Sequence, residues 1–267
     1  SDWPVRVDVD LTGRCRGMLF DLLADGAEVA VGDGRFSLTL APLAGRLLMA
    51  AADRPPGECG VLLHPTSLPS RHGIGGLGAE ARAFADFLAA ARQNYWQILP
   101  LNPVGYGNSP YHSASAFAGE PLLIDVDRLA AEGLVTAAEI EAAGREAGLA
   151  RTPAERVDYP AVRRYKECLF RRAFGRFSPP ADYEAFRRDN ACWLDDYALY
   201  MALAGRFGDD CWLRWPRDAA CREEAALRGY AAQMADEVEY HIFLQYLFRR
   251  QWDDLRADVH AKGIKII

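Results

Sequence analysis

The stretch GVLLHPTSLPSRHGIGGLG (Gly60–Gly78), followed by YWQILPLNPVGYGNSPYHSASAFAGEPLLIDVD (Tyr95–Asp127), decides the fold class. It holds two short continuous apolar runs, at 60–63 and 95–99, of the kind found in strands buried on both faces. Between them, over 78–92, apolar residues return at helical spacing. This order predicts a strand, a helix and a second, parallel strand.

A long loop is predicted after the second strand. Glycines and prolines interrupt the chain repeatedly between 100 and 110, so residues 102–118 are expected to be irregular. In a (β/α)8 barrel the loops at the carboxyl ends of the strands build the functional site. The sequence therefore predicts that this loop contributes to the functional site.

Residues 127–258 have a strongly helical pattern that is rich in Arg and broken by prolines. We expect a large helical insertion there, whose last helix runs over 235–262 and ends at Gly263, before a strand at 264–267. The whole pattern predicts an α/β fold, an incomplete (β/α)8 TIM barrel. Aromatic residues at helical spacings in this region are predicted to be core: Trp193, Tyr197, Tyr200, Phe243, Tyr246 and Trp252.

The first 52 residues differ in texture from the rest. Short segments in which apolar and polar residues alternate, separated by Asp-Gly turn signals, predict a small antiparallel β module over 1–52. The polar stretch 53–58 predicts a linker to a barrel part at 59–267. The chain begins without Met and stops within a predicted strand. We therefore expect a piece of a longer protein.

Composition narrows the function classes. The 267 residues carry 31 Lys and Arg against 37 Asp and Glu, a net charge of −6, without a basic stripe for nucleic acid. No apolar run or signal segment indicates a membrane protein. The six cysteines form no C-x-x-C pair, so neither a zinc site nor disulfides are predicted, and a cytoplasmic protein is expected.

The loop segment Tyr106–His112 combines aromatic rings, short polar side chains, glycines and a proline. Sugar rings present flat C–H faces and an edge of hydroxyl groups, which aromatic platforms and nearby polar groups can bind. The glycines allow close approach of the backbone, and Pro110 stiffens it. The loop is therefore a candidate sugar-binding site.

The two quoted stretches, together with LDDYALYMAL and GIKII, closely resemble the amylomaltases, the 4-α-glucanotransferases of glycoside hydrolase family 77. The resemblance runs from about Cys59 to Ile267. It implies a (β/α)8 barrel with helical insertions and a retaining transfer of α-1,4-glucan segments between maltodextrins. The implied partners are maltooligosaccharides and starch- or glycogen-derived α-glucans, and neither a metal nor an organic cofactor is implied. Separately, Arg16–Leu48 resembles the C-terminal β-sandwich of α-amylase-type enzymes, which implies a fusion.

By resemblance, Tyr111 would stack on the sugar near the cleavage point, Ser109 would bond a neighbouring glucose, and Tyr106 would belong to an outer glucan surface. His64, which ends the first strand, is a further substrate-binding candidate, with a structural role as its alternative. Asn108 stands where many family members have Asp, which leaves subsite preference open.

Retaining glycosidases need two carboxyl groups about 5–5.5 Å apart. The family's catalytic carboxylates lie on later strands, so this chain is expected to contain no catalytic residue and to be inactive alone. Asp125 and Asp127 are interpreted as a strand end and helix cap, and Asp195 and Asp196 as a helix pair. Two alternatives remain open, an α-glucan hydrolase and a non-catalytic glucan-binding module.

Overall fold

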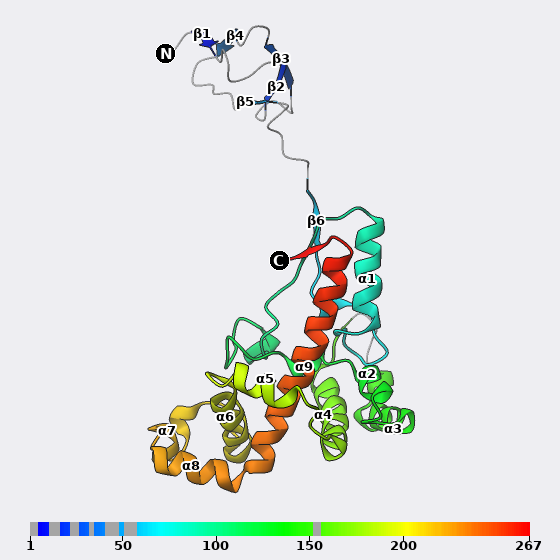
Figure 1. The fold of residues 1–267 in the computed structure, drawn as a ribbon, viewed down its shortest axis with the longest axis vertical. Helices are drawn as coiled ribbons and strands as arrows, with labels where there is room; N and C mark the ends of the chain where they lie inside the picture. Colours follow the sequence, from blue (N-terminus) through cyan, green and yellow to red (C-terminus); the bar gives the residue numbers. More distant parts are fainter. Residues whose placement is uncertain are drawn as a thin grey trace. The chain divides into compact units, whose positions relative to one another are not determined.

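The computed structural model describes residues 5–10, 17–21, 27–31, 35–40, 48–50, 58–151 and 156–267. The chain divides into two compact units, Ser1–Glu58 and Cys59–Ile267, whose elements are labelled in Figure 1. None of the helices in the described residues combines the length and the apolar character that a membrane span needs.

The strands of the N-terminal unit pair antiparallel, as the sequence predicted. Strand β1 (Val5–Asp10) pairs with β4 (Arg35–Leu40), and β2 (Gly17–Asp21) lies between β3 (Ala27–Val31) and β5 (Leu48–Ala50). Along β1 the charged residues are exposed and the valines between them are half-buried, which is the two-residue period of a strand. The Asp-Gly turns and most of the expected linker lie outside the described residues.

The larger unit contains a parallel three-stranded sheet in the order β6-β7-β8, made by β6 (Gly60–Leu62), β7 (Tyr95–Gln97) and β8 (Lys265–Ile266). Helix α1 (Ala79–Ala90) connects β6 to β7 and completes the predicted β-α-β unit. Gly60 is required by the close approach of the two strands, because a Cβ there would lie 2.5 Å from the Cβ of Tyr95.

Helix α9 (Ala235–Ala261) links the helical region to the sheet and lies beside α1 (Figure 1). It ends where predicted, since Gly263 has a φ of +78° and the chain then enters β8. Leu88 of α1, Trp96 of β7 and Leu255 and Val259 of α9 are buried in one cluster that joins these elements.

The region between β7 and α9 is helical, as predicted, and Figure 1 shows it gathered around the N-terminal half of α9. Its α-helices are α2 (Val126–Ala131), α3 (Ala137–Ala147), α4 (Tyr159–Arg176), α5 (Tyr183–Asp189), α6 (Leu194–Phe207), α7 (Arg217–Ala220) and α8 (Glu224–Gln233). Side-chain caps start several of them. Thr136 and Glu139 form a reciprocal capping box, and Asp158 accepts from the N–H of Ala161.

The predicted core aromatics divide into two groups. Tyr197, Phe243 and Tyr246 are buried, whereas Tyr200, Trp193 and Trp252 are only partly buried. The prediction is therefore right for the first group and too strong for the second.

Two glutamines of α9 hold the segment that follows the long loop. Gln245 accepts from the N–H of Gly119 at 2.7 Å and donates to its carbonyl at 3.0 Å. Gln251 accepts from the N–H of Asp125 at 2.6 Å and donates to its carbonyl at 3.3 Å. Each amide thus replaces a missing peptide partner, which satisfies backbone groups that would otherwise be buried without one.

A buried lysine completes this attachment. Lys166 of α4 is 2% exposed, and its Nζ donates to the carbonyls of Leu122 at 2.6 Å and Ile124 at 2.7 Å. Burial lowers the pKa of Lys166 to about 8, although the nearby Asp125 and Glu120 oppose the shift. The segment 119–125 is therefore fixed by α9 on one side and α4 on another.

Candidate functional site

The loop after β7 is irregular, as predicted, apart from two short 3-10 turns, Tyr106–Asn108 and Pro121–Leu123. Gly107 and Asn108 both have left-handed backbones, with φ values of +67° and +56°. Gly105 lies against the backbone of His112, and a Cβ there would be 1.7 Å from the His112 carbonyl oxygen. The chain can double back on itself only because these positions tolerate such conformations.

The predicted substrate-binding residues of the loop lie on its outer side. Tyr106 is 88% exposed and Tyr111 is 73% exposed, while Ser109 is partly buried. The hydroxyl of Ser109 accepts from the N–H of Tyr111 at 3.3 Å, and the ring of Tyr106 meets His112 edge-on, with centroids 6.4 Å apart. The rings are thus presented to solvent by a constrained backbone, as a sugar platform requires.

His64 lies at the inner side of the loop. Its Nδ1 accepts from the N–H of Leu99 at 3.2 Å, and burial lowers its pKa to about 4. At neutral pH the ring is therefore uncharged, and its proton is on Nε2. A neutral imidazole with one fixed donor can bond a sugar hydroxyl without the cost of burying a charge.

Sequence reasoning missed Glu120, whose buried carboxylate anchors the loop. Its Oε2 accepts from the N–H of Val104 at 2.6 Å, its Oε1 accepts from the N–H of Leu122 at 2.9 Å, and its own N–H donates to Leu101 at 2.8 Å. Burial raises the pKa of Glu120, and the two N–H donors oppose this shift. Pro121, at the first position of the turn, was the available sequence signal that a cap residue precedes it.

The loop and the first strand end share a small cavity. His64, Asn102, Asn108, Pro110 and Glu120 are among its lining residues, and its volume is about 110 Å³. The structure therefore brings one predicted residue, His64, together with two residues of the loop tip and the unpredicted Glu120. Tyr106, Ser109 and Tyr111 do not line this cavity.

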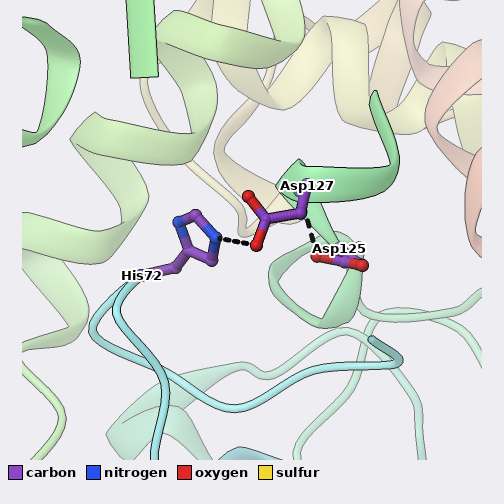
Figure 2. Close-up of side chains that lie close together, drawn as sticks. All are labelled: His72, Asp125 and Asp127. Atoms are coloured by element: carbon purple, nitrogen blue, oxygen red, sulfur yellow. Dashed lines mark hydrogen bonds and ion pairs between the residues drawn. The ribbon is translucent and has the colours of Figure 1, made fainter. Parts of the chain in front are cut away.

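Figure 2 shows a second cluster of polar side chains, made by His72, Asp125 and Asp127. Their potential metal-ligating atoms all lie within 4.8 Å of one another, which is close enough for the three side chains to share a cation. His72 is 5% exposed; its Nδ1 lies 2.7 Å from the Tyr165 hydroxyl, and its Nε2 lies 3.2 Å from Asp127 Oδ2.

The carboxylates of this cluster already have partners. The Arg71 guanidinium pairs with both oxygens of Asp127, and Asp125 Oδ1 accepts from the N–H of Asp127 at 3.0 Å. Partial burial alone would raise the pKa of Asp127, but Arg71 and His72 hold it below its ordinary value. A metal ion would have to displace Arg71, so we interpret the cluster as a tie between the 65–76 segment and α2.

The remaining candidate carboxylates also have structural contacts. Asp125 is the N-cap of α2, as predicted. Asp195 pairs with Arg187 at 3.4 Å and Asp196 with Arg222 at 3.0 Å, in the first turn of α6, where a negative charge stabilises the helix N-terminus.

Comparison with known proteins gives one consistent result. Residues 63–267 match the family model of glycoside hydrolase family 77, described as 4-alpha-glucanotransferase. A 4-alpha-glucanotransferase of Thermus thermophilus is 48% identical over 218 residues, and one of Streptococcus pneumoniae is 41% identical over 214 residues. These alignments cover 79% of this chain but only 42% and 41% of the relatives. The chain thus spans about two fifths of their length.

Two solved structures are similar as well. An amylomaltase of Streptococcus agalactiae in complex with acarbose aligns with a TM-score of 0.69 and 35% identity, over 78% of this chain and 42% of its own. An amylomaltase of Corynebacterium glutamicum aligns with a TM-score of 0.61 over 99% of this chain and 43% of its own, at 14% identity, which bears on the fold alone.

Proposed function

Because the chain belongs to the 4-alpha-glucanotransferase family, we propose that the full-length protein transfers α-1,4-glucan segments between maltodextrins by a retaining double displacement. The observation that carries the proposal is the family match over 63–267, supported by 48% identity to the Thermus enzyme. This chain supplies substrate-binding residues, and the catalytic carboxylates come from the remainder of the polypeptide.

The fold supports a barrel origin for this part. Strands β6, β7 and β8 are parallel and adjacent, and the loop after β7 lies at a carboxyl strand end, where barrel enzymes place their sites. We infer that they begin a (β/α)8 barrel and that the helices between β7 and α9 are an insertion. The cytoplasmic location expected from the sequence remains a prediction.

Within the site, Tyr111 provides a stacking platform, Ser109 and His64 bond sugar hydroxyls, and Tyr106 extends the surface outward. The exposure of Tyr106 and Tyr111 and the neutral tautomer of His64 support these roles. Transfer requires that a second sugar, in place of water, attacks the glycosyl-enzyme intermediate. Residues of this loop would favour that outcome by binding an acceptor glucan.

The N-terminal unit has two possible origins, a fused α-amylase tail or an accessory module of the same enzyme. The alignment over 99% of this chain with an amylomaltase is a likeness of fold alone and is compatible with the second. Expression of the intact gene product, followed by mass determination and N-terminal sequencing, separates the two, because a fusion requires an amylase domain on the same polypeptide.

Incubating the full-length protein with maltotriose tests the reaction itself. Transfer produces longer maltodextrins together with glucose. Production of glucose and maltose alone would indicate a hydrolase, and binding without any product would indicate a glucan-binding module.

A further inference from the structure

An exposed aromatic ring packs on a tryptophan at the far end of the long loop. Phe117 is 70% exposed, yet its ring stacks on Trp193 with centroids 6.2 Å apart and planes 18° apart. Ser115 Oγ accepts from the N–H of Phe117 at 3.1 Å, and Trp193 Nε1 donates to Asn190 at 3.1 Å. The backbone of Phe117 is therefore held by Ser115, and its ring packs on Trp193 while most of the ring remains open to solvent.

A cavity of about 210 Å³ lies beside this ring. At about 30 Å³ per water molecule in the liquid, it is larger than a single buried water needs and of the size class of one sugar ring. Phe117 and Trp193 line it together with Trp252 of α9, which is also partly buried. Two of the aromatics that were predicted to be core thus line a cavity.

A hydrogen-bond acceptor and hydrogen-bond donors line the same cavity. Asn102 donates through its Nδ2 to the Ser115 carbonyl, at 2.8 Å, which leaves its Oδ1 without a partner among the described residues. Arg249 pairs with Asp253 through its Nε at 2.6 Å, and within the same part of the chain its two Nη groups have no partner. The cavity therefore offers one acceptor and several donors beside a flat apolar face.

From these contacts we propose that the cavity beside Phe117 is a second sugar-binding subsite, which holds one glucose unit of an α-glucan on the open face of Phe117. The proposal rests on the proposed function for the ligand class. The Asn102 oxygen accepts from a sugar hydroxyl, and the Arg249 guanidinium donates to another. The side chains of Asn102 and Arg249 are already restrained by Ser115 and Asp253, so less conformational entropy is lost on binding.

This subsite is separate from the first one. Tyr106, Ser109 and Tyr111 do not line its cavity, and neither does His64. Asn102 lines both this cavity and the smaller one near His64, because the loop runs between them. A glucan chain that follows the loop would therefore contact both ends of it, and the subsite would contribute to the binding of long glucans more than short ones.

Affinity electrophoresis of the full-length protein in native gels containing amylopectin tests the subsite without depending on turnover. The variant Phe117→Leu keeps an apolar side chain but loses the flat face, whereas Phe117→Tyr keeps it. Leu is expected to raise the apparent Kd about three- to tenfold, and Tyr to leave it within about twofold. Phe87→Leu, at another exposed aromatic, on α1 and 60% exposed, is the matched control and should change nothing.

Two outcomes overturn the subsite. One is an unchanged Kd for Phe117→Leu, and the other is an equal loss for Leu and Tyr. A lower melting temperature for Phe117→Leu with unchanged affinity would show that the ring packs against another part of the polypeptide. Steady-state kinetics add a second readout, because loss of remote binding raises KM for maltoheptaose with little change in kcat. If the wild type elongates maltotriose but Phe117→Leu binds normally, only the subsite fails; if the wild type does not elongate it, the proposed function fails.

Discussion

The carboxylate of Glu120 and the N–H of Val104 are joined by a hydrogen bond of 2.6 Å that closes the base of the loop after β7. Both carboxylate oxygens are acceptors: Oε2 accepts from the N–H of Val104 and Oε1 from the N–H of Leu122. An amide of the same shape has only one acceptor oxygen and presents a donor on the other side.

The first prediction follows from that difference. Glu120→Gln is expected to break one of the two bonds and to raise amide hydrogen exchange in residues 101–112. The unfolding free energy should fall by about 1 kcal/mol, at the low end of the cost of a buried unpaired N–H. Glu146→Gln, at an exposed position of α3, is the control. Unchanged exchange in the loop would contradict the anchoring role.

The second prediction concerns the proposed stacking platform. Tyr111→Ala in the full-length protein should lower kcat/KM for maltotriose by tenfold or more, since about 1.4 kcal/mol of transition-state stabilisation corresponds to tenfold. Tyr111→Phe keeps the ring and should retain most of the activity. An unchanged rate for the Ala variant would remove Tyr111 from the site.

The third prediction is that residues 1–267 alone have no transferase activity. A retaining mechanism needs a pair of carboxyl groups, and Asp125, Asp127, Asp195 and Asp196 all have structural contacts. Thin-layer chromatography of maltotriose digests, with the full-length protein as the positive control, measures this. Measurable elongation by the purified chain would refute it.

The fourth prediction concerns the amide that holds Gly119. Gln245→Leu removes both bonds and leaves a buried N–H and a buried carbonyl without partners, so the unfolding free energy should fall by about 2–4 kcal/mol. Urea unfolding of the full-length protein measures the change. Gln233→Leu, at an exposed position of α8, should lie within about 0.5 kcal/mol of the wild type. Similar values for the two variants would show that the clamp contributes nothing.

The fifth prediction is a pH dependence from Lys166. Its folded pKa of about 8 is below the unfolded value of 10.5, so the unfolded chain binds more protons between these values. The unfolding free energy of the wild type should therefore rise relative to Lys166→Met as pH increases from about 8 to 10.5, by roughly 3 kcal/mol at most. The neutral amine still has two N–H groups for its two carbonyl partners. A constant difference across this range would contradict the shift.

Local sequence signals predicted local structure well. The Gly263 cap, the Asp125 cap and the irregular loop follow from backbone preferences of single residues, which tertiary contacts did not override. The sequence also predicted which loop would present Tyr106 and Tyr111, because glycine and proline spacing can be read directly.

Contacts between distant residues could not be predicted. Gln245 and Gln251 look like ordinary polar positions of a helix, and only the fold brings Gly119 and Asp125 to them. Lys166 looks like a solvated residue of an Arg-rich helix, and its burial depends on carbonyls more than 40 positions away. Trp193 and Trp252 were predicted to be core because helical periodicity indicates a shared face without showing whether that face is covered or lines a cavity.

The two glutamine clamps join residues with the same separation, 126 positions in each case. The helical region therefore begins and ends at the same place, because the segment before it is hydrogen-bonded to α9, the helix that closes it. For a flexible loop between two fixed ends, each doubling of its length adds only about 0.6 kcal/mol to the entropic cost of closing it. Evolution or protein engineering could thus exchange helices α5 to α8, provided that Gln245 and Gln251 of α9 and Lys166 of α4 remain to hold the segment 119–125.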